Sequence, residues 1–207
     1  AEDYEAAVTY CDAILNARGV GAPAFLATAT HSSWFSMFNP GNSNESIFEI
    51  QYNYEENQTN NLPKLFDNEH ADGIYRISRA LTQMFNSEYS ATLYEMKEAV
   101  RSMYGGYFVG PDATIFESAT VSYVWKYLGS QTLSDKRTAS YYDPNFIIYR
   151  VADVMLMKAE ALILRTHGEN IEDKVEAMKL INEIRTRSNL EIEVEATAEA
   201  VEPLDEE

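Results

Sequence analysis

The residues with the clearest chemistry in this sequence are aromatic side chains set in polar, loop-like stretches. The chain of 207 residues contains 14 Tyr, 9 Phe and 2 Trp, and several of them lie outside any regular apolar pattern. A flat aromatic ring can stack on the C–H face of a sugar, while Asn, Gln, Asp and Arg side chains satisfy the hydroxyl groups around it. We therefore predict a concave ligand-binding surface that draws on these residues: Trp34, Tyr54, Tyr104, Tyr107 and Tyr141.

A different interpretation of the same aromatic residues stays open. An aromatic residue in a long loop more often anchors that loop to the core than it contacts a ligand. The polar stretch 53–61, which is predicted to be an exposed loop, is a further binding candidate through Tyr54, Gln58 and Asn60.

Motifs that indicate catalysis are absent from the sequence. It contains no G-x-S-x-G, no G-x-x-x-x-G-K-[ST] and no H-E-x-x-H, and its three histidines share no spacing. The single cysteine, Cys11, excludes an internal disulfide and a cysteine-based zinc site. Asp153 and Glu160 could reach the separation of a glycosidase carboxylate pair, but structural ion pairing is the favoured interpretation. We predict a non-catalytic protein without metal or cofactor.

Charge restricts the class of partner. The formal net charge of −17 argues against nucleic acid or anionic lipid, because both are bound through Lys and Arg. Residues 191–207 carry eight acids and no base, lack a core pattern, and are predicted to be a disordered tail. No apolar run reaches the roughly 18 residues that span a bilayer, and no signal peptide begins the chain. Any membrane attachment is therefore expected to lie outside this sequence.

A helical framework must position these residues, and its strongest signal lies in residues 149–190. Apolar residues run nearly all round the stretch 151–164, which is typical of a buried helix. Gly168 suits a left-handed helix end. From Ile171 onward, apolar residues recur at helical spacing. Together these signals predict an αα-hairpin.

The hairpin also predicts ion pairs. If its helices are antiparallel about Gly168, Asp153 faces Arg185 and Arg150 lies near Arg187. A charge on a buried helix requires a partner. We therefore expect Asp153 to pair with Arg185 or Arg187.

Shorter elements are predicted elsewhere. An amphipathic helix over 2–18 places Cys11 on its apolar face, where a small buried thiol is expected. Residues 46–52 alternate, which predicts a half-buried strand with Phe48 and Ile50 on the same side. The remaining predicted elements are a helix over 74–86 and strand-like segments over 104–109 and 121–127.

The hairpin sequence also resembles a known family. YRVADVMLMKAEAL, a turn ending in glycine, and EAMKLINEIRTRSNL are similar to the pattern of the SusD/RagB family of outer-membrane nutrient-binding lipoproteins. Three further segments fit in the same order, at 34–52, 98–101 and 124–127. Family members are typically more than twice as long, so the chain resembles their middle portion, without the lipoprotein N-terminus and the C-terminal segment. After Arg187 the sequence departs from the family's usual A-G-L, which touches only the helix end.

The resemblance carries expectations about fold and function. It implies a mostly α fold of tetratricopeptide-like hairpins with long loops and a few short β-strands, forming one SusD-like domain over 1–190 that precedes the acidic tail 191–207. It implies non-catalytic capture of a glycan or other nutrient at the bacterial outer-membrane surface, and delivery to a SusC-like TonB-dependent transporter. It assigns no ligand residue. The alternatives are a helical scaffold that binds protein and, in third place, a carboxylate glycoside hydrolase.

Overall fold

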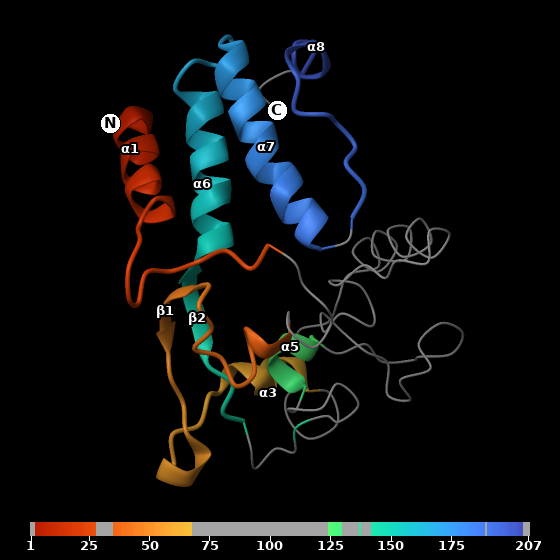
Figure 1. Ribbon diagram of the computed structural model, residues 1–207. Helices are drawn as coiled ribbons and strands as arrows, with labels where there is room; N and C mark the ends of the chain where they lie inside the picture. The colour runs from red at the N-terminus through yellow and green to blue at the C-terminus, as the bar shows by residue number, and fades with distance from the viewer. Residues whose placement is uncertain are drawn as a thin grey trace, which may run out of the picture. The chain divides into compact units, whose positions relative to one another are not determined.

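The computed structural model describes residues 3–27, 35–67, 124–129, 137, 142–188 and 190–204. In chain order the elements are α1 (Tyr4–Leu15), β1 (Ser46–Ile50), the 3-10 turn η1 (Tyr54–Glu56), α3 (Leu62–Phe66), α5 (Trp125–Leu128), β2 (Phe146–Arg150), α6 (Val151–Leu164), α7 (Ile171–Arg187) and α8 (Ala198–Val201). Strands β1 and β2 form a two-stranded sheet (Figure 1). Within these ranges, every helix is too short or too polar to cross a lipid bilayer.

The chain divides into two compact units. The first unit is Ala1–Thr28, Asn44–Phe48 and Tyr149–Glu207, and the second unit is Ala29–Ser43 and Glu49–Ile148. The single domain expected over residues 1–190 stays a prediction.

The first unit is built around helix α6. This helix packs between α1 and α7, which Figure 1 draws on either side of it. Its side chain Leu162 is 0% exposed and lies in a cluster with Val8 of α1 and Ala177 of α7. Burying one leucine side chain contributes about 1.5–3 kcal/mol. This burial on two sides explains most of the apolar sequence of α6, although Leu156 and Met157 on the same helix are 46% and 41% exposed.

The αα-hairpin is confirmed, and its ends are set by local chemistry. His167 and Gly168 have positive φ angles of 52° and 71°, and Gly168 adopts such an angle without steric cost. Asn170 caps α7, because its side-chain oxygen accepts a hydrogen bond from the Asp173 backbone N–H at 3.0 Å.

Polar pairs show the register of the hairpin. Lys158 of α6 binds Glu176 of α7, and Arg165, just after α6, binds Asp173 at 2.6 Å. Both pairs lie opposite each other as an antiparallel register about Gly168 predicts. Lys158 also binds Asp12 of α1 at 2.6 Å, so one buried ammonium group joins all three helices.

Strand β1 forms where it is predicted, but its apolar side chains are not covered. Phe48 is 57% exposed and Ile50 is 44% exposed, while Glu49 between them is half-buried. The Glu49 carboxylate accepts hydrogen bonds from the Asn42 backbone at 2.5 Å and the Asn145 side chain at 2.9 Å. Alternation places these side chains on opposite faces of a strand, but it does not decide which face the rest of the fold covers.

The strand predicted over 121–127 is wrong where the structure describes it. Residues 125–128 form helix α5, because the Tyr127 and Leu128 backbone N–H groups both bond to the Val124 carbonyl. Tyr127 stacks on Phe66 of α3 with ring centroids 5.4 Å apart, so this tertiary contact favours the helical turn over the strand. The segments predicted over 74–86 and 104–109 lie outside the described residues.

The acidic tail contains structure that its sequence does not predict. Thr197 caps the short helix α8 by accepting a hydrogen bond from the Ala200 backbone at 3.3 Å. Val201 is 0% exposed. Side chains of α7 also hold the tail backbone: Asn182 donates to the Val194 carbonyl at 2.9 Å, and Lys174 donates to the Leu204 carbonyl. One buried valine and these side-chain-to-backbone hydrogen bonds hold a segment that lacks a repeating apolar pattern.

Candidate functional site

An exposed turn in the second unit carries a predicted ligand residue. In this turn, residues 53–58, Asn53 and Gln58 form an isolated antiparallel bridge, and the Asn53 side chain accepts a hydrogen bond from the Glu55 backbone at 3.0 Å. Asn57 adopts a left-handed φ of 58°, which asparagine tolerates better than most residues. Tyr54 opens η1 and is 36% exposed. The 53–58 turn therefore presents an aromatic ring and a side-chain amide, that of Gln58, at the surface.

The turn continues into a buried anchor at Asn60. Asn60 is 3% exposed, and its side chain donates to the Pro144 carbonyl at 2.8 Å and accepts from the Leu62 backbone at 2.9 Å. Its backbone N–H donates to the Tyr142 carbonyl at 2.7 Å. The predicted loop is thus exposed over the 53–58 turn, while Asn60 serves structure rather than ligand contact.

Residues 142–145 form a hub to which several loops of the second unit are tied. Tyr142 is 0% exposed and donates its phenol proton to Asp67. Arg137 binds Asp143. The Asn145 side chain accepts from the Tyr52 backbone at 3.1 Å. This 142–145 hub gives the 53–58 turn a defined base, and it follows Tyr141 directly in the chain.

Burial changes the acidity of Tyr142 in the hub. Desolvation first, and then the hydrogen bond and the negative charge of Asp67, raise the pKa of the Tyr142 phenol well above its ordinary value. The phenol therefore stays protonated and remains a hydrogen-bond donor, as a structural anchor should.

The four residues predicted to form ion pairs lie in the first unit and are brought together differently from the prediction. Asp153 lies in the first turn of α6 and accepts a hydrogen bond from the Arg150 backbone at 3.0 Å, with the Arg150 guanidinium 3.6 Å away. Its side chain is 38% exposed. The Asp153 carboxylate is therefore paired within its own helix terminus, where it acts as a helix cap. Arg185 instead binds Glu193 at 2.8 Å, and Arg187 binds Glu45 at 2.9 Å.

Glu45 is the residue that sequence reasoning missed. Its side chain and that of Arg187 are each 1% exposed, and Arg150 approaches the same carboxylate at 3.5 Å. Glu45 also accepts from the Leu26 backbone at 3.0 Å, and the Arg187 guanidinium lies 4.7 Å from the Phe25 ring centroid. In the sequence Glu45 stands in a turn-like stretch of polar residues, where an exposed carboxylate is the usual expectation. Its distance of 142 positions from Arg187 leaves no local signal.

Cys11 is the small buried thiol that was expected. It is free and buried in α1, and burial first, then the neighbouring Asp12, raises the pKa of its thiol. A raised pKa leaves little thiolate at neutral pH, so Cys11 is a poor nucleophile.

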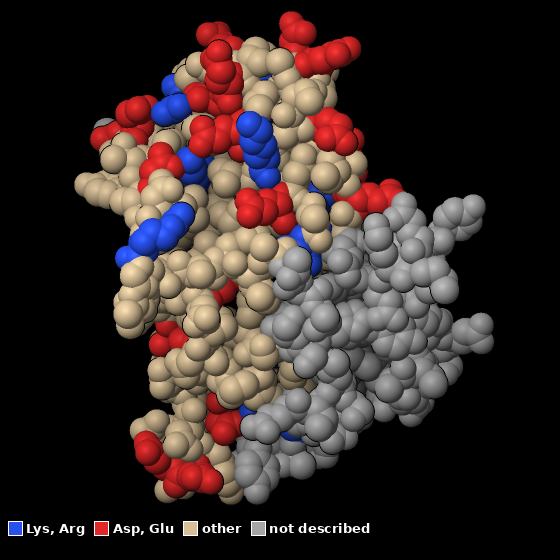
Figure 2. All heavy atoms as spheres, in the orientation of Figure 1, with Lys and Arg blue, Asp and Glu red and all other residues tan. Residues whose placement is uncertain are grey.

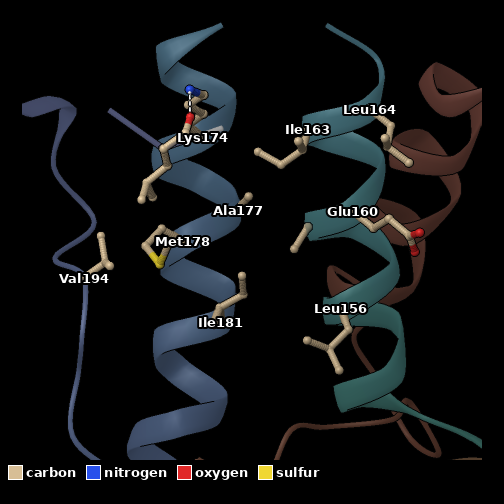
Figure 3. A pocket seen from close by; sticks show the side chains of 11 residues that line it. Leu156, Glu160, Ile163, Leu164, Lys174, Ala177, Met178, Ile181 and Val194 are labelled. Atoms are coloured by element: carbon tan, nitrogen blue, oxygen red, sulfur yellow. Dashed lines mark hydrogen bonds between the residues drawn. The ribbon is translucent and has the colours of Figure 1, made fainter. Parts of the chain in front are cut away.

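A groove beside the hairpin is a second candidate surface. It has a volume of about 600 Å³ and is lined by apolar side chains of α6, α7 and the tail, as Figure 3 shows for Ile163, Met178 and Val194. Two lining residues are charged: Lys174, whose ammonium group is held by the Leu204 carbonyl, and Glu160, which is exposed. The groove offers apolar contact without any aromatic ring to stack on a sugar.

The structure describes one of the five predicted aromatic ligand residues, Tyr54. The other four, Trp34, Tyr104, Tyr107 and Tyr141, lie outside the described residues. Among the described residues, no cluster of His, Cys, Asp and Glu is arranged to hold a metal ion.

Comparison with known proteins identifies the family of this chain. The family model of the SusD family matches residues 75–205, a range that includes both helices of the hairpin. The chain belongs to the SusD family. No curated protein matches the chain.

Two solved structures have a similar fold. Surface glycan-binding protein A from Bacteroides thetaiotaomicron is 20% identical with a TM-score of 0.54, and the alignment covers 96% of this chain and 45% of that one. Surface glycan-binding protein A from Bacteroides uniformis is 19% identical with a TM-score of 0.50, and the alignment covers 96% of this chain and 40% of that one. The chain thus spans less than half the length of either neighbour. The likeness supports the mostly helical, SusD-like fold.

Proposed function

We propose that this chain is part of a non-catalytic glycan-binding protein of the bacterial outer-membrane surface. The captured glycan, or a nutrient of similar chemistry, passes to a SusC-like TonB-dependent transporter, and a lipid anchor attaches the protein to the membrane. Support comes from membership in the SusD family and from the names of the two structural neighbours. We also propose that residues 1–190 act as one SusD-like domain.

The observation that carries the proposal is the 53–58 turn. Tyr54 is an exposed aromatic residue. Its turn leads into the buried Asn60, whose side chain is fixed by a hydrogen bond to the Pro144 carbonyl. A preformed aromatic surface loses little conformational entropy on binding, because its backbone is already fixed. Gln58 adds an exposed amide that can donate to and accept from sugar hydroxyls. Stacking and hydrogen bonding of this kind bind a sugar without breaking a bond.

Affinity electrophoresis against a panel of neutral and acidic polysaccharides tests the proposal. We expect one or more polysaccharides to retard the chain, Tyr54→Ala to abolish most of the retardation, and Tyr54→Phe to preserve it. Tyr149→Ala is the matched control, because Tyr149 is also an exposed tyrosine, 50% exposed, but lies in the first unit. Equal losses in both alanine variants, or no retardation by any polysaccharide, would contradict the proposal. Release of reducing sugar over hours would instead favour a hydrolase.

The groove of Figure 3 favours a second candidate function, a scaffold that binds protein. Leu156 on its lip is 46% exposed, and an apolar groove between helices is a common seat for an amphipathic helix. Titration with a labelled amphipathic helical peptide tests this function, with Leu156→Asp expected to weaken binding and Tyr54→Ala to leave it unchanged. The scaffold function is supported if the peptide binds and no polysaccharide does.

A further inference from the structure

The charges around Tyr54 restrict the glycan that the 53–58 turn can hold. Two of its six residues are acidic, Glu55 and Glu56, and both side chains are exposed. The sequence between Asn42 and Pro63 contains four acids and no Lys or Arg. Figure 2 shows acidic side chains, in red, over the golden segment that Figure 1 draws after β1.

These carboxylates are available to act on a ligand. Among the described residues, neither Glu55 nor Glu56 has an ion-pair partner. Glu49 on the adjacent strand differs from them, because Asn42 and Asn145 donate hydrogen bonds to it. A ligand that stacks on Tyr54 therefore meets two carboxylates that no described cation neutralises.

An anionic glycan would need the opposite chemistry. Sulfate and uronate groups are bound by Arg and Lys through charge-assisted hydrogen bonds, and the turn supplies none. Neutral sugar hydroxyls, in contrast, suit the amide of Gln58 and the ring of Tyr54. The net charge of −17 also repels anionic glycans at longer range.

We propose that the 53–58 turn selects neutral glycans and rejects anionic ones through Glu55 and Glu56, an inference that rests on the proposed glycan-binding function. The selection is electrostatic and therefore depends on salt. Two carboxylates that act on one ligand charge through water give roughly a three- to ten-fold preference at low ionic strength, and this preference shrinks as the Debye length falls to about 8 Å in physiological salt.

The experiment compares polymers with one backbone and different charge. A neutral polysaccharide that retards the chain is paired with its sulfated or carboxymethylated derivative, and retardation is measured at low and at physiological salt. We expect the neutral form to bind better at low salt and the ratio to approach one as salt rises. Glu55→Gln with Glu56→Gln should raise binding of the anionic form by about three- to ten-fold relative to binding of the neutral form. Glu199→Gln, an exposed acid of the first unit, is the control.

The outcomes separate the two proposals. If no polysaccharide of either charge binds, the proposed function fails and this inference fails with it. If an anionic form binds as well as or better than its neutral partner at low salt, the function stands and the charge selection is refuted. If the preference exists but the double glutamine variant does not change it, the role of Glu55 and Glu56 is refuted.

Discussion

In the first unit the buried side chains of Glu45 and Arg187 carry opposite charges, whereas in the second unit the buried side chain of Asn60 bonds two neutral backbone groups. The two arrangements tolerate damage differently. Removing one partner of a buried ion pair leaves an uncompensated charge in a low-dielectric site. Removing one partner of a neutral hydrogen bond leaves only an unsatisfied dipole. The first unit is therefore expected to be more sensitive to single substitutions at its polar core than the second.

The largest effect is expected from Arg187→Met. The Glu45 carboxylate, 1% exposed, then loses its nearest cation, and the loss in free energy of unfolding should be about 3–5 kcal/mol. Urea unfolding followed by circular dichroism measures it. Adding Glu45→Gln to this variant should recover part of the loss, because it removes a buried carboxylate charge that then has Arg150, 3.5 Å away, as its remaining cation. A single-variant loss below about 1 kcal/mol would show that the pair is not the ionic core of this unit.

Tyr142→Phe should have a smaller effect, confined to the second unit. Asp67, 0% exposed, loses a donor, and the expected loss is about 1–3 kcal/mol. The substitution should also change how the free energy of unfolding depends on pH in alkaline solution. Because the pKa of Tyr142 is raised on folding, its contribution is complete below pH about 10 and is lost as pH rises above that value, where the unfolded chain ionises. The variant should therefore lose less stability than the parent chain above about pH 10. If stability falls equally with pH in the variant and the parent chain, the raised pKa of Tyr142 is contradicted.

Tyr54→Ala tests the surface that the second unit presents rather than its core. The substitution removes an aromatic ring that is 36% exposed, so thermal stability should change little. Glycan affinity should fall about two- to twelve-fold, since an aromatic stacking contact contributes about 0.5–1.5 kcal/mol. Fluorescence titration measures the affinity. A large loss of stability would show that the ring serves the fold.

The smallest effect is expected from Arg185→Ala. Arg185 is two residues from Arg187 on the same helix, but its partner Glu193 is 76% exposed. A solvent-exposed pair contributes about 0–1 kcal/mol, and salt should reduce even that value. Its unfolding curve, measured beside that of Arg187→Met, gives the contrast directly. Equal losses in the two variants would contradict the assignment of one pair to the core and the other to the surface.

The sequence predicts the helical part of the first unit well. The hairpin, its glycine-containing turn and the antiparallel register follow from local apolar periodicity and helix-end chemistry, and the structure confirms them. The buried thiol of Cys11 follows from the same periodicity. The candidate site was only partly predictable: an exposed aromatic at Tyr54 can be recognised from its polar neighbours, but Asn60, three residues before Pro63, gives no sign that it is buried.

The sequence alone determined where the longer helices α1, α6 and α7 lie and that the net charge disfavours anionic partners, because helical periodicity and total charge are properties of the chain itself. The tertiary structure decided that Arg187 pairs with Glu45 rather than Asp153, and that Phe48 stays exposed while Glu49 is half-buried. Each of these outcomes depends on residues distant in the sequence, and no local pattern encodes which distant segment covers a given face.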